Sequence, residues 1–208
     1  MVVIAITAWF ALALQLYLML KRAPSIGFSA TDTVINFFSY FTILSNLLVA
    51  KSLTVSLLLP SSPFGIFFSK MSVQSAIAVY IFIVGLVYNL VLRNLWDPEG
   101  WQLVADNLLH VAVPVLYVLF WLIFTPKKIL QWKNIFPLLI FPAVYLVYTL
   151  IRGSVAGWYP YPFVNADKLG YGQVAVNSLL VLLAIVTAGL GIIAFNRFTK
   201  RTRIAKQF

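Results

Sequence analysis

Six long apolar stretches divide this chain, and each is long enough to cross a lipid bilayer. They cover residues 1–20, 33–50, 72–92, 104–124, 134–151 and 173–195. Prolines, glycines and charged residues separate them, as in residues 21–24 (KRAP), 60–63 (PSSP), 96–100 (WDPEG) and 125–128 (TPKK). A helix needs about 20 apolar residues to span the hydrocarbon core. The pattern predicts an all-α polytopic membrane protein, a single domain over residues 1–208 with six transmembrane helices.

The composition is that of a membrane protein, and it excludes several kinds of metal, haem and catalytic site. The chain is 62% hydrophobic and 10% charged, outside the range of soluble domains. The first stretch lacks a basic start and a small-residue cleavage site, so we expect a retained helix rather than a signal peptide. With one histidine and no cysteine, zinc sites of His/Cys type, bis-histidine haem and cysteine nucleophiles are excluded. We therefore expect no metal and no cofactor, and the pattern sets no oligomeric state.

Charge predicts the orientation of the helices. An even number of spanning helices places both termini on one side, and ten of the 15 Lys and Arg residues fall on that side: Lys51, Lys70, Lys127, Lys128, Lys133, Arg197, Lys200, Arg201, Arg203 and Lys206. The opposite side holds Lys21, Arg22, Arg93, Arg152 and Lys168 with the acids Asp32, Asp97, Glu99 and Asp167. The positive-inside rule then places both termini in the cytoplasm. Because the net charge of +10 sits at helix ends and in the tail, we expect no nucleic-acid partner.

His110, the only histidine, lies inside the fourth apolar stretch. An ionisable side chain is costly in hydrocarbon, so His110 is a candidate functional residue. Counting at 1.5 Å per residue from the outer side puts His110 at a depth of about 9 Å and Thr42, in the second stretch, at about 14 Å. Asp106 precedes His110 by one helical turn, just inside the membrane. Pro114 cannot donate to the His110 carbonyl, so we expect a kink at the histidine.

Other polar side chains gather in the same outer half of the predicted bundle, and far fewer lie in the inner half. They are Ser39, Ser45, Asn46, Tyr88, Asn89, Arg93, Tyr145, Tyr148, Arg152 and Asn177. This asymmetry predicts a polar cavity that opens outward. Each residue also has a structural interpretation. Thr42 and the serines would bond within or between helices, Asp106 would favour the first turn of its helix, and His110 would bond between helices.

An aromatic segment with prolines lies in the predicted outer loop, residues 153–172. It contains Trp158, Tyr159 and Tyr161, and Gly170 and Gly172 follow it. One interpretation is an aromatic belt at the membrane interface. The other is a lid over a lipid-accessible cavity, moving at the glycines.

Three of these segments together resemble a known family. Residues 37–46 (FFSYFTILSN), residues 106–110 (DNLLH) followed by Pro114, and residues 158–163 (WYPYPF) followed by Gly170-Tyr171 are similar to the androgen-induced-gene family of integral membrane proteins, in its bacterial six-helix branch. The resemblance implies intramembrane hydrolysis of fatty acid esters of hydroxy fatty acids by a threonine nucleophile with a partner histidine. These roles map onto Thr42 and His110. It also implies membrane lipids as substrate and an active site in the outer half of a bacterial cytoplasmic membrane.

The chemistry of the residues agrees with that resemblance. A threonine hydroxyl is a weak nucleophile until a base takes its proton, and neutral histidine suits that role. Asp106 or Asn107 would orient the imidazole, and Ser45, Asn46 or Asn89 would donate to the oxyanion.

Three other classes fit the helix pattern. A small transporter or channel would need polar groups through the full thickness of the membrane, and a rhomboid-like protease would need a serine motif that the sequence lacks. A non-enzymatic lipid-binding or structural membrane protein fits the same helices without any dyad. Loss of hydrolysis on substituting Thr42 distinguishes the hydrolase from all three.

Overall fold

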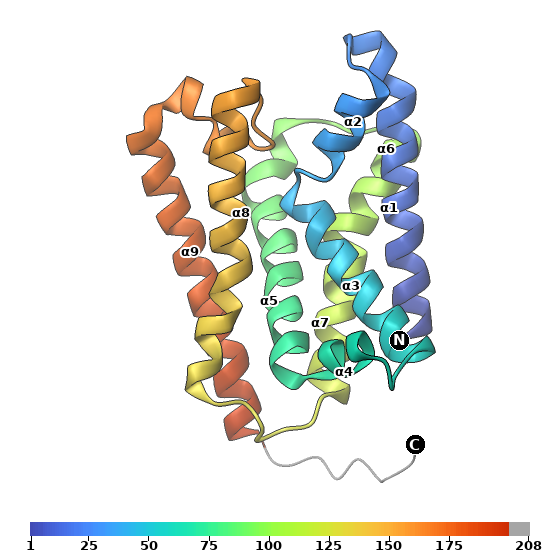
Figure 1. Cartoon of the computed structure of the whole chain (residues 1–208), viewed down its shortest axis with the longest axis vertical. Helices are drawn as coiled ribbons and strands as arrows, with labels where there is room; N and C mark the ends of the chain where they lie inside the picture. The colour runs from blue at the N-terminus through green and yellow to red at the C-terminus, as the bar shows by residue number, and fades with distance from the viewer. Residues whose placement is uncertain (200–208) are drawn as a thin grey trace.

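The computed structural model describes residues 1–199 and shows six helices of spanning length in one bundle (Figure 1). The spans are Val2–Ile26, Phe41–Leu58, Met71–Leu95, Gly100–Phe124, Trp132–Ala156 and Ala166–Phe198. No strand occurs among residues 1–199. The prediction of an all-α polytopic membrane protein with six transmembrane helices is confirmed. Lys200, Arg201, Arg203 and Lys206 of the predicted basic tail lie outside the described residues.

The spanning helices alternate in direction along the chain. In order, the elements are α1 (Val2–Arg22), η1 (Ala23–Ile26), α2 (Ala30–Phe37), α3 (Phe41–Leu58), α4 (Pro63–Ser69), α5 (Met71–Val87), η2 (Tyr88–Leu92), η3 (Arg93–Leu95), α6 (Gly100–Asn107), η4 (Leu108–Ala112), α7 (Val113–Phe124), η5 (Trp132–Asn134), α8 (Ile135–Ala156), η6 (Pro162–Val164) and α9 (Ala166–Phe198). The start of α1 and the end of α9 lie at the same end of the bundle (Figure 1). We call this the terminal end, and the opposite end the site end.

The central core is apolar and closely packed between α1, α3, α5 and α7. It includes Ala8, Ala11, Val49, Ile77, Ile81, Val113, Tyr117 and Trp121, all essentially inaccessible to solvent. The α8–α9 hairpin joins this core through a smaller cluster around Val79 and Ile185. There the Tyr80 hydroxyl donates to the Leu138 carbonyl at 2.7 Å. Small residues let the helices approach closely, as is usual where lipid supplies no hydrophobic drive between helices.

The second apolar stretch is not one helix. We expected a continuous helix over residues 33–50, but α2 ends at Phe37 and α3 begins at Phe41. The break is held from outside the stretch: the Tyr145 hydroxyl of α8 accepts from the Phe41 N–H at 3.2 Å and donates to the Ser39 carbonyl at 2.9 Å. The predicted depth of Thr42, nine residues into a helix, is therefore wrong. Thr42 lies in the first turn of α3.

Two π-helical segments interrupt the third and fourth spans. They are η2, which follows α5, and η4, which contains His110. In η4 the Val113 N–H bonds to the Leu108 carbonyl, and Pro114 follows directly. At the histidine, where we predicted a kink, the structure has a π-helical turn, and Pro114 cannot donate to the regular ladder there. Single π turns inside helices recur at functional sites.

The loop predicted over residues 153–172 is shorter in the structure. Helix α8 continues to Ala156 and α9 begins at Ala166, so the connection covers residues 157–165 rather than 153–172. Gly153 lies inside α8, where a Cβ atom would fall 2.0 Å from the Tyr159 ring. It is therefore a packing position and not part of a loop. Gly170 does interrupt α9, with φ 74° and ψ 154°, a conformation that glycine adopts readily.

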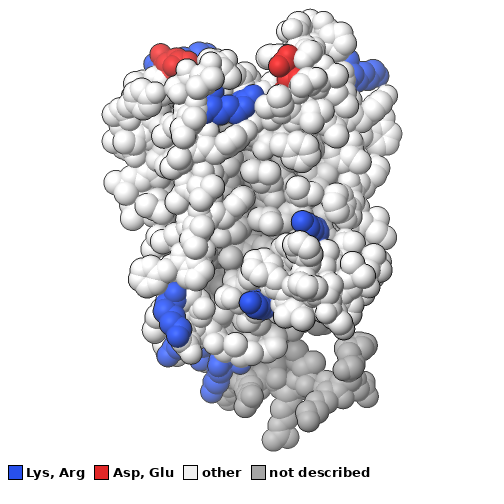
Figure 2. All heavy atoms as spheres, in the orientation of Figure 1, with Lys and Arg blue, Asp and Glu red and all other residues white. Residues whose placement is uncertain are grey.

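Charge differs between the two ends of the bundle. On the face shown in Figure 2, acidic side chains lie only at the site end, whereas the lower half shows only basic ones. Lys127 is the most enclosed of these bases. Its ammonium lies over the Trp121 and Phe195 rings, 5.0 and 4.9 Å from their centroids, and donates to the Leu122 carbonyl. Burial lowers the pKa of Lys127.

Candidate functional site

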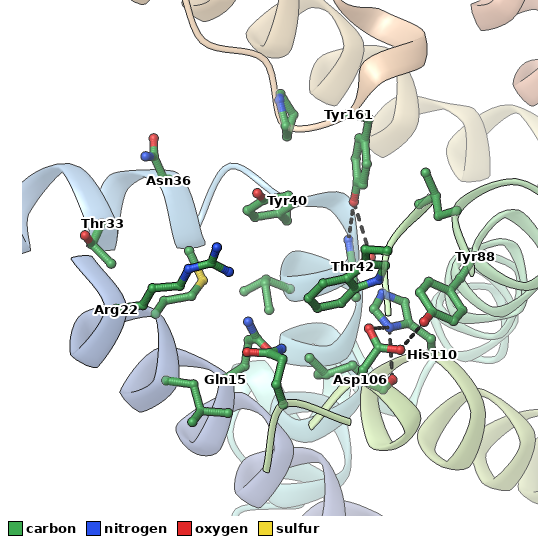
Figure 3. Close-up of a pocket in the computed structure, with 18 of the residues that line it drawn as sticks. Gln15, Arg22, Thr33, Asn36, Tyr40, Thr42, Tyr88, Asp106, His110 and Tyr161 are labelled. Carbon is green, nitrogen blue, oxygen red and sulfur yellow. Dashed lines mark hydrogen bonds and ion pairs between the residues drawn. The ribbon is translucent and has the colours of Figure 1, made fainter. Parts of the chain in front are cut away.

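Thr42 and His110 line the same cavity at the site end, with a volume of about 590 Å³ (Figure 3). Its walls come from α1, α2, the start of α3, η2, α6, η4 and the 157–165 connection. We call it the polar cavity, because many of its lining side chains carry polar groups: Gln15, Arg22, Thr33, Asn36, Tyr40, Thr42, Tyr88, Gln102, Asp106, His110 and Tyr161. The sequence placed Thr42 and His110 on different helices, and the fold brings them to one space.

Thr42 occupies the amino-terminal turn of α3. The positive end of a helix dipole favours negative charge, so a hydroxyl here is well placed to carry developing anionic character. Thr42 is 7% exposed. Its N–H donates to the Tyr161 hydroxyl at 3.1 Å, and its Oγ1 lies 3.2 Å from the same oxygen. When Tyr161 donates to Oγ1, the hydroxyl hydrogen of Thr42 stays free for a base.

Tyr161 is fixed over Thr42 by neighbouring rings. It stacks on Phe163 with ring centroids 5.2 Å apart and meets Tyr40 edge-on at 5.7 Å. Burial raises the pKa of Tyr161 to about 12, so its hydroxyl keeps its proton near neutral pH. A protonated hydroxyl beside Thr42 Oγ1 can donate to an oxygen that gains negative charge.

His110 has one ring nitrogen occupied and one free for chemistry. Its Nδ1 lies 3.0 Å from the Asp106 carbonyl and 3.2 Å from the Asp106 carboxylate. Both partners are acceptors, so they assign the hydrogen of the neutral ring to Nδ1 and leave Nε2 as the basic nitrogen. The Tyr88 ring stacks on the imidazole, 3.9 Å between centroids and 14° between planes. These contacts fix both the tautomer and the tilt of the ring.

Asp106 is buried behind the histidine. It is 3% exposed and accepts a hydrogen bond from the Tyr88 hydroxyl as well as from His110. Because α6 begins at Gly100, Asp106 is not in the first turn of its helix, and the interpretation as a helix-start carboxylate is wrong. The Asp106 carboxylate therefore bonds to side chains from both π-helical segments, Tyr88 of η2 and His110 of η4.

The backbone behind the site ties Thr42 to the His110 segment. The Asn46 side-chain nitrogen donates to the Thr42 carbonyl at 2.9 Å and to the Leu109 carbonyl at 3.2 Å. These two carbonyl oxygens are thus no more than two hydrogen-bond lengths apart. Figure 3 shows the imidazole between Asp106 and Thr42. Among the described residues Thr42 Oγ1 is bonded to Tyr161 and not directly to His110, as is common before a substrate binds.

The structure places several predicted site residues away from the polar cavity. Ser45 is fully buried without a hydrogen-bond partner among residues 1–199, and the Asn46 nitrogen is committed to two carbonyls. Asn89 and Asn107 donate to carbonyls of their own helices. None of these four side chains lines the cavity. The oxyanion and orienting roles assigned to them do not fit this arrangement.

The predicted cavity and lid residues lie in different parts of the structure. Trp158 and Tyr161 line the polar cavity, and Tyr88 lies beside His110. Ser39, Tyr145 and Tyr148 hold the break before α3, where the Tyr148 hydroxyl lies 2.9 Å from Ser39 Oγ. Tyr145 also lines a second cavity, described below. Tyr159 packs with Val164, Ala166 and Val174 in a small separate core.

Sequence reasoning missed part of the polar wall. Gln102 of α6 donates to Gln15 of α1 at 2.9 Å across the cavity. Arg152 donates to Asn36 at 2.7 Å and lies over the Trp158 ring at 4.6 Å. Gln15 could have been noticed as a polar residue inside the first apolar stretch. The pairing of Arg152 with Asn36 depends on the α2–α3 break and had no signal in the sequence.

A second cavity lies on the other side of Thr42, with a volume of about 810 Å³. Helices α5, α8 and α9 border it, and nearly all of its lining is apolar, so we call it the apolar cavity. Its walls include Ile83, Val84, Val87, Leu139, Ala143, Leu146, Leu150, Phe163, Ala175, Leu179, Val181, Leu182 and Ile185. Thr42, Tyr88, Leu92 and Tyr161 line both cavities.

Comparisons of the chain with protein families, curated proteins and solved structures found no match. Among residues 1–199 no three His, Cys, Asp or Glu side chains gather as metal ligands would. The chemistry of the site therefore has to be argued from Thr42, His110 and their neighbours.

Proposed function

We propose that this protein is an intramembrane lipid ester hydrolase. Thr42 is the nucleophile, His110 the general base and Asp106 the residue that positions the imidazole. One observation carries the proposal: Thr42 lines the same cavity as a histidine whose Nδ1 is held by a buried carboxylate. A nucleophile, a base and a group that orients the base form the arrangement that nucleophilic acyl transfer requires.

The reaction follows from the free atoms of the site. His110 Nε2 accepts the hydroxyl proton of Thr42 while Oγ1 attacks the ester carbonyl carbon. The proton then passes from Nε2 to the alkoxy oxygen, which leaves as an alcohol. A water molecule, deprotonated by the same nitrogen, hydrolyses the acyl-threonine and restores both residues.

The tetrahedral intermediate needs donors for its oxyanion. The Thr42 N–H and the Tyr161 hydroxyl already converge beside Oγ1 and are the donors that we assign. Both sit at the positive end of α3, which favours the same charge.

The substrate class follows from the setting. The site lies within a bundle of apolar spanning helices, so an ester that partitions into the membrane reaches it more readily than a water-soluble one. The resemblance to the androgen-induced-gene family supports fatty acid esters of hydroxy fatty acids or related lipid esters. The charge distribution supports a site that faces outward, with both termini in the cytoplasm. The resemblance to the bacterial branch of that family supports a bacterial cytoplasmic membrane.

Substitution of the dyad tests the proposal. Thr42→Ala should abolish labelling by a fluorophosphonate and hydrolysis of a fatty acid ester, with monodisperse elution in detergent retained. Thr42→Ser should keep part of both activities, because the hydroxyl remains. His110→Ala should reduce both, and the double variant should be little worse than either single one, because the two residues act as a unit. Additive partial losses, or full labelling of Thr42→Ala, would refute the dyad.

A further inference from the structure

The two cavities share a wall at the proposed nucleophile. Thr42 and Tyr161 line both of them, so Thr42 lies between the two spaces. An ester has two branches on either side of its carbonyl carbon. Two spaces on either side of a nucleophile match that branching.

The histidine of the dyad lies on one side of Thr42 only. His110 and Asp106 line the polar cavity and not the apolar cavity. During acyl transfer the histidine must return its proton to the alkoxy oxygen, so that oxygen has to leave on the His110 side. The acyl branch, which stays covalently attached to Thr42, then points to the opposite side.

We infer, on the basis of the proposed hydrolase function, that the apolar cavity holds the acyl chain and the polar cavity holds the alcohol branch. In the transfer step the Oγ1–acyl carbon bond forms and the acyl carbon–alkoxy oxygen bond breaks. The Thr42 proton travels through His110 Nε2 to the departing oxygen, which becomes an alcohol in the polar cavity. The acyl-threonine keeps its hydrocarbon chain between α5, α8 and α9.

The chemistry of the two linings supports this assignment. Aliphatic and aromatic side chains surround the apolar cavity, and its 810 Å³ lies within the range of sites that enclose a whole small ligand. The polar cavity instead exposes Gln15, Arg22 and Gln102, whose polar groups would lose water beside a hydrocarbon chain. A saturated acyl chain therefore gains more from the apolar cavity.

Two alanines in facing helices allow the apolar cavity to be filled. Ala143 lines it from α8 and Ala175 from α9, and both residues are themselves exposed. Their neighbours Val144 and Val176 line neither cavity and are 62% and 53% exposed on the outside of the bundle. Ala143→Phe and Ala175→Phe, with Val144→Phe and Val176→Phe as matched controls, separate filling of the cavity from adding an aromatic ring to the helix.

The assay compares p-nitrophenyl palmitate with p-nitrophenyl butyrate, which share an alcohol and differ in the acyl chain. Each alanine variant should lose at least about tenfold in kcat/KM for palmitate relative to butyrate, the size of effect expected when a few methylenes lose their pocket. The controls should keep the wild-type ratio. Leu18→Trp, which fills the polar cavity, should lower hydrolysis of hexadecyl butyrate relative to ethyl butyrate and leave the palmitate-to-butyrate ratio unchanged.

A cross-linking measurement keeps this inference separable from the hydrolase proposal. A diazirine-bearing palmitate ester should label peptides of α8 and α9 in Thr42→Ala, and Ala143→Phe should reduce that labelling. If the ester labels α8 and α9 but the wild type hydrolyses no ester, the acyl chain binds in the apolar cavity and the hydrolase proposal is refuted. Hydrolysis with an unchanged palmitate-to-butyrate ratio in both alanine variants, or labelling mainly on α1 and α6, would overturn the assignment of the acyl chain.

Discussion

Replacing Tyr161 by Phe should remove catalysis while leaving the fold nearly intact. The substitution deletes one hydroxyl and keeps the ring that stacks on Phe163 and meets Tyr40. The lost contacts are those to the Thr42 N–H at 3.1 Å and to Oγ1 at 3.2 Å. Both lie at the reacting atoms, so the change acts on the transition state more than on packing.

The contacts set the expected magnitudes. Each neutral hydrogen bond contributes about 0.5–1.5 kcal/mol to stability, so the loss of unfolding free energy should be about 1–3 kcal/mol. Losing an oxyanion donor typically lowers kcat by about 100- to 1000-fold, or ~3–4 kcal/mol of barrier. KM for a fatty acid ester should change much less, because the hydroxyl contributes most where charge develops.

Tyr145→Phe is the matched control. It also deletes a tyrosine hydroxyl with two hydrogen bonds at the start of α3, to the Phe41 N–H and the Ser39 carbonyl. Its ring lines the apolar cavity and is kept by the phenylalanine, and its hydroxyl contacts no reacting atom, so kcat should fall by less than about tenfold, the equivalent of ~1.4 kcal/mol. The measurements are kcat and KM with a fatty acid p-nitrophenyl ester in detergent micelles, and thermal unfolding of both variants.

Equal losses of kcat in the two variants would contradict the reasoning. They would mean that both hydroxyls act only by holding the α2–α3 break. Full activity of Tyr161→Phe would show that Tyr161 does not donate to the oxyanion, and the Thr42 N–H would be the one assigned donor left.

Three further predictions concern the support and placement of the site. Asp106→Asn should lower kcat by about 100-fold or more with little change in KM, because the amide cannot hold the His110 tautomer equally well; a rise in KM alone, measured by steady-state kinetics, would refute the positioning role. Gly85→Ala should destabilise the bundle by about 1–3 kcal/mol, because the new Cβ would lie 3.2 Å from the His110 carbonyl and from Pro114; an unchanged Tm in detergent would contradict this close contact. Thr199→Cys should react with membrane-impermeant maleimide only from the cytoplasmic side, and labelling of intact cells would reverse the topology.

The sequence alone determined the helical membrane architecture. Lipid offers no partners to a polar backbone, so each long apolar stretch must close its own hydrogen bonds and becomes a helix. Six such stretches fixed the number of spans. His110 could be selected because it is the only histidine, whereas Thr42 was selected through the resemblance to the androgen-induced-gene family. The missing N–H of Pro114 predicted a kink at His110.

Only the tertiary structure decided how the site is assembled. The break before Thr42 depends on Tyr145, which supplies from α8 the hydrogen bonds that a continuous helix would have closed within itself. The stacking of Tyr88 on His110 depends on two π turns that meet between spans, and the Tyr161–Thr42 bond on where the 157–165 connection folds back. Each of these contacts joins residues distant in the chain. Local periodicity records which face of a helix is apolar, but not which distant hydroxyl will satisfy a particular N–H.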